Sequence, residues 1–488
     1  MQHLNQQNLA SIDNQISKPS FNRSMLKTGM VHIGVGGFHR AHQAYYLQEL
    51  ATKTNQYDWG LCGIGLREED RNISTILKKQ DQLYSLLIKH PNGTIEPHII
   101  GAIVDYKFAI EDPQSVIDKL AHEDTKIVSL TITEGGYNFN PSTGEFDFEN
   151  SIIQEELKHP KNPKSVYGFL AAALQKRRDN KLPAFTILSC DNIEHNGDVT
   201  KKMLLAFTQK LNPELADWIE KEVRFPNSMV DRITPVTTAE DISFLAKNHD
   251  LIDDWPVTCE PFIQWVIEDK FSNGRPALEQ VGVQFVPDVK PYEKMKLRLL
   301  NAGHSVLGIL GAIHGYQTIN ECIDDPLFNT FLKQFMDKEA TPVLDAVKGI
   351  DLDTYKQSLL DRFANPNIKD SVSRICSESA AKLPKFLIPT IKENLDNDGN
   401  IALSTLVIAA WCFYSDKQTD LNNKPLEVID SQKVVLQNSA QIAPLSFIQQ
   451  KAIFGDLSKS ERFTSLYEVM AKELYNNRGV KKQMQKLV

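Results

Sequence analysis

The chain has 488 residues, of which 41% are hydrophobic and 24% charged, as in ordinary globular proteins. This length predicts two or three domains and a core large enough to fold without disulfides or a structural metal. The formal net charge is −8 and no long basic run occurs, which argues against a nucleic-acid partner, because phosphate binding needs clustered Lys and Arg. A small anionic cofactor is still compatible with this charge, since backbone amides and one or two cations can bind it.

Six cysteines are present, with neither a C-x-x-C pair nor zinc-ligand spacing, so we expect buried, reduced cysteines and no metal site. The N-terminus lacks a charged-then-apolar signal pattern. The longest apolar stretch, Ile401 to Tyr414, is shorter than the roughly 20 residues of a membrane span and is predicted to be a buried helix. A cytoplasmic protein with no membrane partner is expected.

Short apolar runs alternate with helical patterns through the first half of the chain. Residues 30–34, 59–66, 126–132 and 184–190 are predicted strands rich in apolar residues, and a helix follows the first strand around Ala44 to Leu47. Such strands separated by helices indicate a parallel sheet covered on both faces. The expected fold class is therefore α/β, with a doubly wound, Rossmann-type sheet domain.

The texture of the sequence changes near Phe225, and from Tyr292 onward nearly every segment has the pattern of an amphipathic helix. We predict a Rossmann-type domain at residues 1–224 and a mainly helical domain at residues 225–488. The alternative is a sheet that continues as far as Val286.

A glycine-rich turn directly follows the first predicted strand and opens a helix. Glycines at such a turn let the backbone approach a pyrophosphate, and the helix N-terminus supplies amide donors. The third glycine of the usual fingerprint is replaced by His39, and Arg40 could add a direct charge to the pyrophosphate. The alternative is a turn that binds no ligand. The candidate residues are Gly34, Gly36, Gly37, Phe38, His39 and Arg40.

An acidic segment follows the second predicted strand. Glu69 or Asp70 is expected to bind the adenosine ribose and to repel a 2′-phosphate, which favours NAD over NADP. The gap from the glycines exceeds the roughly 20 residues usual for this acid, so the helix between them must be long or extended by a loop. A solvated acidic loop is the alternative, and Arg67 nearby argues against a strict preference for NAD.

Polar residues of unusual type share one face of the predicted helix from Tyr292 to Leu310. With Lys296 at zero and about 100° per residue, Glu293, His304 and Asn301 project at ~60°, ~80° and ~140°. Oxidation of a secondary alcohol needs a base, which a lysine can be when burial or a nearby cation lowers its pKa, and asparagine amides can stabilise the alkoxide. This chemistry needs no metal. The alternative is a solvated edge with one packed histidine.

With these motifs the sequence resembles the polyol-specific long-chain dehydrogenases/reductases, over nearly its whole length. The matching segments are 34–43, 129–137, 189–192, 225–235, 260–262, 296–304 and 361–363. One departure is Ala302-Gly303, where the family commonly has Gly-Ser between the asparagine and the histidine.

The resemblance implies NAD as cofactor, a site between the two domains and a monomeric enzyme with a small polyol or ketose as substrate. It implies Lys296 as general base, with Glu293 linked to proton relay. The other implied site residues are Asn192 and Asn301 for the oxyanion, and His304, Asp231 and Arg374 for the polyol chain. Without the resemblance, Asn192 could instead cap a helix near Gly197, Asp231 could pair with Arg232, and Arg374 would be a surface arginine.

The expected reaction interconverts D-mannitol and D-fructose. Within the family, the alternatives are reduction of fructuronate or tagaturonate and oxidation of arabinitol or sorbitol. An NAD-binding sensor without catalytic activity is an alternative of another class, although it would not need to retain Lys296 and both asparagines.

Overall fold

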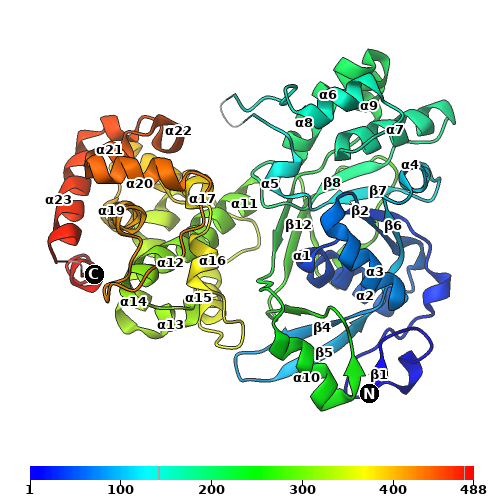
Figure 1. The fold of residues 1–488 in the computed structure, drawn as a ribbon, viewed down its shortest axis with the longest axis horizontal. Coiled ribbons are helices and arrows are strands. Elements are labelled where there is room, and N and C mark those ends of the chain that lie inside the picture. The colour runs from blue at the N-terminus through cyan, green and yellow to red at the C-terminus, as the bar shows by residue number, and fades with distance from the viewer. Residues whose placement is uncertain (141–142, 478) are drawn as a thin grey trace. The chain divides into compact units, whose positions relative to one another are not determined.

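The computed structural model describes residues 1–140, 143–477 and 479–488. The chain divides into two compact units, Met1–Val289 and Lys290–Val488 (Figure 1). This division lies beyond the boundary expected after residue 224, because the strands between Ser228 and Val286 pair and pack within the N-terminal unit.

A five-stranded parallel sheet forms the centre of the N-terminal unit, with strand order β6-β3-β2-β7-β8. The chain moves outward from β2 to β3 and β6 and then crosses to β7 and β8, so the order reverses between β2 and β7. Ligands of open α/β sheets bind at such a switch point, outside the carboxyl ends of the strands. The strands are β2 (Met30–Ile33), β3 (Leu61–Gly65), β6 (Ile103–Phe108), β7 (Ile127–Leu130) and β8 (Thr186–Ser189).

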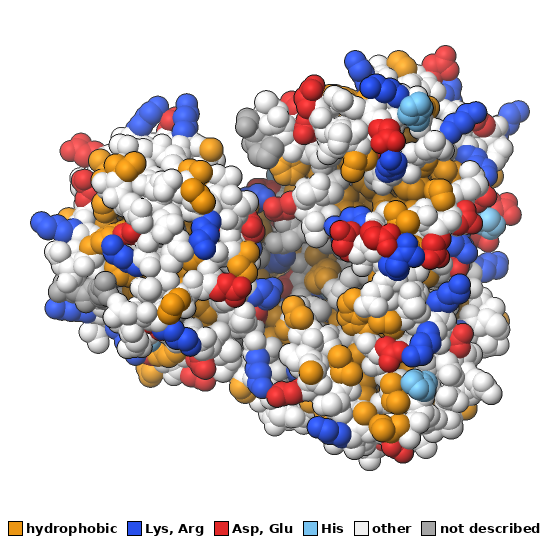
Figure 2. All heavy atoms as spheres, viewed as in Figure 1, with side chains coloured by type: hydrophobic (Ala, Val, Ile, Leu, Met, Phe, Trp, Pro, Cys, Tyr) orange, Lys and Arg blue, Asp and Glu red, His pale blue; other side chains and the backbone are white. Residues whose placement is uncertain are grey.

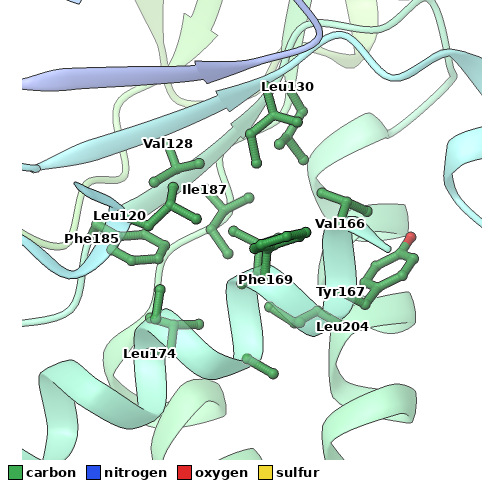
Figure 3. Close-up of a cluster of buried hydrophobic side chains, with 14 of the residues drawn as sticks. Leu120, Val128, Leu130, Val166, Tyr167, Phe169, Leu174, Phe185, Ile187 and Leu204 are labelled. Atoms are coloured by element: carbon green, nitrogen blue, oxygen red, sulfur yellow. The ribbon is translucent and has the colours of Figure 1, made fainter. Parts of the chain in front are cut away.

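Helices cover both faces of this sheet, which confirms the predicted doubly wound α/β class. One face packs against α4 (Pro113–Ala121), α7 (Val166–Asp179) and α8 (Asn196–Leu211), and Figure 3 shows this core, with Phe169 and Leu174 of α7 beneath Val128 and Ile187 of the sheet. The other face packs against α2 (Gln43–Thr54) and α3 (Arg71–Lys79). The four predicted strands are confirmed as β2, β3, β7 and β8, and they are mostly apolar because the sheet is buried on both sides.

Smaller sheets complete the N-terminal unit, in the orders β11-β4-β5, β13-β12-β9 and β1-β10. Their strands are β1 (Gln2–His3), β4 (Tyr84–Lys89), β5 (Ile95–Ile100), β9 (Ser228–Asp231), β10 (Leu251–Ile252), β11 (Val257–Cys259), β12 (Gln264–Glu268) and β13 (Gln284–Val286). The remaining α-helices are α1 (Gly37–Ala41), α5 (Thr133–Gly136), α6 (Ser151–Lys158), α9 (Pro213–Glu222) and α10 (Ala239–His249).

The C-terminal unit is helical in its described residues, as predicted. Its centre is formed by α12 (Ala302–His314) and by α19 (Ala402–Lys417), which is buried from Leu403 to Asp416 and confirms the predicted buried helix. The other helices are α11 (Lys290–Lys296), α13 (Ile319–Asp324), α14 (Pro326–Phe335), α15 (Leu352–Phe363), α16 (Val372–Cys376), α17 (Ser379–Phe386), α18 (Ile388–Asp396), α20 (Lys433–Ile442), α21 (Pro444–Ile448), α22 (Lys451–Phe454), α23 (Glu461–Asn477) and α24 (Val480–Gln485).

Surface and core follow the composition of the chain. Acidic and basic side chains are interspersed over the surface of each unit in the view of Figure 2. All six cysteines are buried and unpaired. Within the part of the chain that the structure describes, no helix combines the length and the apolar character needed to cross a membrane.

Candidate active site

The glycine-rich turn lies at the switch point, between the ends of β2 and β7. Gly34 has a φ of 94°, and a Cβ atom there would lie 2.1 Å from the carbonyl oxygen of Thr131, so only glycine fits. A Cβ on Gly36 or Gly37 would meet nothing closer than 3.8 Å. The turn is therefore tight on its inner side and open above, as close approach of a pyrophosphate to the backbone requires.

The next side chains support this turn from inside the unit. His39 is buried, and its imidazole stacks on that of His32 with 3.5 Å between the ring centroids. Burial and the neighbouring His32 and Arg40 hold the pKa of His39 well below its usual value, so the ring is neutral. The buried Arg40 donates from Nη1 to the carbonyl oxygen of Trp255 at 2.7 Å. Because Arg40 is only 2% exposed, a direct ion pair with a pyrophosphate would require the guanidinium to become more accessible. Phe38 is half-buried and stacks on His42 with 4.9 Å between the ring centroids.

The acidic segment lies at the carboxyl end of β3. Asp70 accepts the backbone N–H groups of Leu66 and Arg67 at 2.9 and 3.0 Å through Oδ2, which fixes its half-buried carboxylate, whereas Glu69 is exposed. The wide gap between the glycines and Asp70 arises because α2 is followed by a loop and the short 3₁₀ helix Tyr57–Trp59 before β3 begins. The carboxyl end of this strand is where Rossmann domains bind the adenosine ribose.

The end of β8 is tied to the end of β7 by Asp191, the residue before Asn192. Its buried carboxylate accepts the N–H groups of Ile132 and Thr133, each at 2.9 Å, and the hydroxyl of Tyr137 at 2.7 Å. Burial raises the pKa of Asp191. The loops that follow the two strands are thus held in one arrangement at the switch-point edge of the sheet.

The N-terminus of α8 is capped by a residue other than Asn192. The amides of Gly197 and Asp198 donate to Oδ1 of Asn227 at 2.9 and 3.0 Å. The capping role considered as an alternative for Asn192 is therefore filled by Asn227. Asn192 itself is exposed and lies five residues before Gly197.

Asp231 is the last residue of β9, which is held beside the end of β8. The side-chain amide of Asn196 donates to the carbonyl oxygens of Asp191 and Ser228 at 3.0 and 2.8 Å, and the N–H of Ser228 returns a bond of 2.9 Å. These bonds place Ser228, the first residue of β9, beside the end of β8, whereas Asp231 is the last residue of β9 and is 4% exposed.

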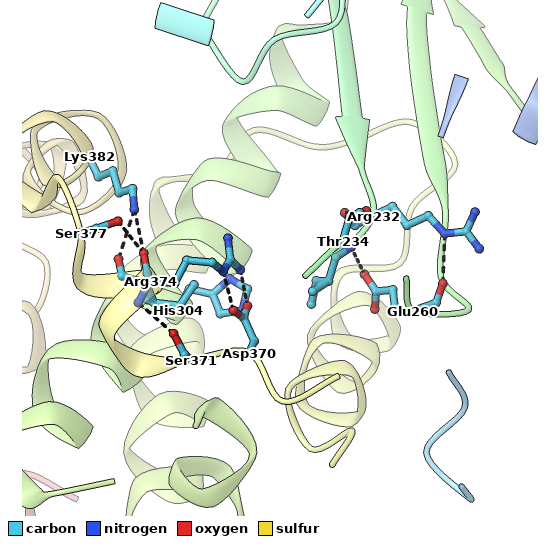
Figure 4. Close-up of polar contacts among 11 residues, drawn as sticks. Arg232, Thr234, Glu260, His304, Asp370, Ser371, Arg374, Ser377 and Lys382 are labelled. Carbon is cyan, nitrogen blue, oxygen red and sulfur yellow. Dashed lines mark hydrogen bonds and ion pairs between the residues drawn. The ribbon is translucent and has the colours of Figure 1, made fainter. Parts of the chain in front are cut away.

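Arg232 stabilises the chain around Asp231 through main-chain groups. Its Nε donates to the carbonyl oxygen of Glu260 at 3.0 Å, and its Nη1 donates to that of Ala41 at 2.7 Å. The Glu260 carboxylate in turn accepts the N–H of Ile233 at 2.6 Å (Figure 4). Arg232 is therefore not solely an ion-pair partner of Asp231, because it binds main-chain carbonyl groups.

In the C-terminal unit, Glu293, Lys296, Asn301 and His304 lie on one helical segment, which is not a continuous α-helix. After α11 ends at Lys296, residues Leu297–Asn301 (η6) form a π-helical turn, and α12 begins at Ala302. Such a turn accommodates roughly one extra residue, so the residues after it are set back by up to ~100°. His304 then projects at an angle between ~80° and ~−20°, closer to the direction of Lys296 than a regular helix allows.

His304 is buried among charged groups. Its ring centroid lies 4.4 Å from that of Phe363, and its Nε2 atom lies 3.9 Å from Oδ2 of Asp370. Burial first, and four nearby cations second, hold the pKa of His304 well below its usual value. The imidazole is therefore neutral and can exchange hydrogen bonds with a hydroxyl group. The four cations are Arg374, Arg362, Lys382 and Lys296.

Arg374 projects from α16, which lies against α12. The two helices can approach because Gly308 has no side chain: a Cβ atom there would lie 2.7 Å from Cγ2 of Ile375. Asp370 accepts Nε and Nη2 of Arg374 at 2.7 and 2.5 Å (Figure 4). The structure thus places Arg374 beside His304, and Asp370 is a residue of this site that sequence reasoning missed. Its spacing of four residues from Arg374 is a signal that was present in the sequence.

The Ala302-Gly303 departure concerns packing in the C-terminal unit. Ala302 is fully buried, and a Cβ atom on Gly303 would lie 3.2 Å from Cδ1 of Leu332. A serine at position 303 would require Leu332 to move by a few tenths of an ångström.

Both units match family models of known proteins. Residues 28–280 match the mannitol dehydrogenase Rossmann domain, and residues 288–475 match the mannitol dehydrogenase C-terminal domain. The chain belongs to the mannitol dehydrogenase family. The resemblance inferred from the sequence motifs is thereby confirmed.

Several known proteins are similar to this chain over almost their whole length. The chain is 44% identical over 474 residues to a mannitol 2-dehydrogenase of Aspergillus fumigatus, with 94% of each chain covered. A structure of Pseudomonas fluorescens mannitol 2-dehydrogenase, in a ternary complex with NAD and D-mannitol, matches with a TM-score of 0.92 and 44% identity, covering 100% of this chain and 99% of that one. A substrate-free D-sorbitol dehydrogenase structure matches with a TM-score of 0.89 and 35% identity, covering 99% and 100%.

Proposed function

We propose that this protein is an NAD-dependent mannitol 2-dehydrogenase that interconverts D-mannitol and D-fructose without a metal. The observation that carries the proposal is the match of the whole chain, at 44% identity, to the mannitol 2-dehydrogenase that was solved with NAD and D-mannitol. The candidate residues of both units have the chemical types that this reaction needs.

NAD fits the N-terminal unit. The turn at Gly34 is open above Gly36, where a pyrophosphate would approach the backbone, and Asp70 is fixed at the carboxyl end of β3 for the ribose hydroxyls. The negative charge of Asp70 would repel the 2′-phosphate of NADP. When bound, NAD accepts a hydride from the carbon that bears the reacting hydroxyl.

Proton transfer is assigned to the C-terminal unit. Lys296 takes the hydroxyl proton at Nζ, and the amide groups of Asn192 and Asn301 donate hydrogen bonds to the oxygen as negative charge develops on it. Glu293, one helical turn before Lys296, passes the proton toward solvent. In the reduction of a ketose the same groups act in reverse order.

Binding of the sugar chain is assigned to Asp231, His304 and Arg374. The neutral His304 suits a hydroxyl group, which both donates and accepts hydrogen bonds. The charge of Arg374 is offset by Asp370, which supports an uncharged polyol over the carboxylate of fructuronate or tagaturonate. Retention of Lys296 and both asparagines supports an enzyme over a catalytically silent sensor.

An NADH-oxidation assay with D-fructose, fructuronate and tagaturonate side by side tests the proposal, with D-mannitol, D-sorbitol and D-arabinitol in the reverse direction. We expect the highest kcat/KM for the D-fructose and D-mannitol pair. Activity confined to the uronates, or NADH binding without turnover of any of these compounds, would refute it. A cytoplasmic monomer is also expected, which light scattering and cell fractionation can check.

A further inference from the structure

We propose that Asp370 is a positioning residue that fixes Arg374 and balances the charge around His304, and thereby sets the preference of the site for an uncharged substrate. This inference rests on the proposed function. The Asp370 side chain is 4% exposed, so its carboxylate is nearly shielded from water.

The backbone around Asp370 is held in place by the chain that follows α12. The N–H of Ile319 donates to the carbonyl oxygen of Asp370 at 2.9 Å, and the N–H of Val372 donates to that of Gln317 at 2.9 Å. Ser371, between them, forms an isolated β-bridge with Thr318. The main chain of Asp370 is therefore fixed against residues 317–319, which follow α12, the helix that contains His304.

Asp370 binds the Arg374 guanidinium along one edge, through two hydrogen bonds. The carboxylate takes Nε and Nη2, and the N–H of Arg374 is bound by Oγ of Ser371 at 3.1 Å. Among the described residues, Nη1 has no hydrogen-bond partner. An arginine side chain that is 46% exposed would otherwise sample many rotamers, so the two bonds fix one orientation and leave the Nη1 donors for a ligand hydroxyl.

The same carboxylate lies next to His304. Its Oδ2 atom, which accepts Nη2 of Arg374, is 3.9 Å from Nε2 of His304, a distance at which charge acts although no hydrogen bond forms. Burial is the larger cause that lowers the pKa of both His304 and Lys382. Four cations lower the pKa of His304 further, and Arg374 also lowers that of Lys382. Asp370 brings a negative charge to this group, next to His304 and Arg374. Its removal makes the surroundings of His304 more positive, which favours a carboxylate-bearing sugar.

The test compares Asp370→Asn with the control Asp325→Asn in the full-length protein. Asp325 is a shielded carboxylate of the same unit that binds Lys481 and the hydroxyl of Tyr316. For Asp370→Asn we expect KM for D-fructose to rise about 10- to 100-fold, as expected when a charge-assisted hydrogen bond is lost. The Kd of NADH should stay unchanged, kcat should fall less than KM rises, and D-gluconate should become a stronger competitive inhibitor.

Labelling of Arg374 by phenylglyoxal, followed by peptide mass spectrometry, tests the interaction between Asp370 and Arg374 without any substrate. Arg374 should react faster in Asp370→Asn than in the wild type and in Asp325→Asn. Equal labelling rates, or an unchanged KM, or a KM change that Asp325→Asn reproduces, would overturn the inference. Wild-type protein that turns over neither D-fructose nor D-mannitol would refute the proposed function, and the labelling would still decide the role of Asp370.

If Asp370→Asn does not fold, Asp370→Glu provides the same test. It keeps the charge but displaces the guanidinium by the length of one methylene group. We expect a smaller rise of KM for D-fructose than for Asp370→Asn and little change in gluconate inhibition. A wild-type KM and a wild-type labelling rate for Asp370→Glu would overturn the inference.

Discussion

Gly308→Ala is expected to disturb the substrate half of the site through the packing of α16 on α12. The new Cβ atom would lie 2.7 Å from Cγ2 of Ile375 and 3.3 Å from Sγ of Cys376. Cγ2 is bound directly to the branched Cβ of Ile375, so it is not the flexible end of a side chain and cannot move aside by itself. The helix that carries Arg374 must therefore move away.

The magnitude follows from two opposing effects. Alanine in place of glycine inside a helix contributes about 1 kcal/mol to stability, whereas overpacking of this kind costs about 1–3 kcal/mol. We therefore expect a net loss of roughly 0–2 kcal/mol in the free energy of unfolding. A displacement of Arg374 by a fraction of an ångström should raise KM for D-fructose about 10-fold, since a shift of about 1 Å can cost 100-fold.

Steady-state kinetics with D-fructose and NADH, together with urea unfolding, measure both effects. Gly303→Ala on the same helix is the matched control, because its Cβ atom would lie 3.2 Å from the flexible end of Leu332 and at ordinary contact distances, 3.6 and 3.8 Å, from the ring of Phe363. It should be neutral or stabilising and leave KM unchanged. If Gly308→Ala were as stable as Gly303→Ala and kept the wild-type KM, the close approach of α12 and α16 would not be what positions Arg374.

Three further predictions concern catalysis, cofactor choice and pH. Lys296→Ala should lower kcat by about 100- to 10,000-fold while fluorescence titration shows unchanged NADH binding, and near-normal turnover would contradict its role as base. Asp70→Ala should reduce the ratio of kcat/KM for NAD over NADP, whereas an unmoved ratio would place the discriminating residue elsewhere. Burial raises the pKa of Glu339, which caps the N-terminus of α19 by accepting the N–H groups of Leu403 and Ser404, to about 7. The folded state then binds this proton more tightly than the unfolded chain, so stability should fall by roughly 2–3 kcal/mol between pH 5 and pH 8. Urea unfolding can measure this loss, and Glu339→Gln should show a flatter pH dependence than the wild type.

The sequence pattern identified the central sheet because β2, β3, β7 and β8 are buried on both faces and consist mostly of apolar residues. The edge strand β6 escaped prediction, since its sequence Ile103–Phe108 alternates with polar residues and only its two end residues are buried. The strands beyond Phe225 are short, and their place in the N-terminal unit depends on pairing between distant segments, such as Trp265 with Val230. Such long-range pairing is not visible in local sequence patterns.

The candidate residues differed in how far the sequence alone could identify them. The turn at Gly34 has a local cause, because Gly34 has a positive φ and lies against Thr131. A glycine motif directly after a predicted strand is therefore enough to predict it. Arg374 and Asp370 lie near His304 only because α16 packs on α12. A single arginine on a short helix gives no sign of that packing in the sequence. Asn227, which caps α8 from 31 residues beyond Asn196, is invisible to capping rules for the same reason, because those rules describe neighbours in the sequence.

The π-helical turn changes the direction that a regular helical wheel gives for one side chain, His304. A helical wheel assumes 3.6 residues per turn, and the segment Leu297–Asn301 breaks that assumption without proline or glycine. The turn is stabilised by its surroundings, since Leu297, Leu299 and Leu300 are buried and Arg298 binds the carbonyl oxygen of Lys385 at 2.7 Å. A turn of this width costs regular helical hydrogen bonds, and the packed leucines offset that cost. What the segment gains is convergence: one helix can then direct a lysine and a histidine, eight residues apart, toward the same side.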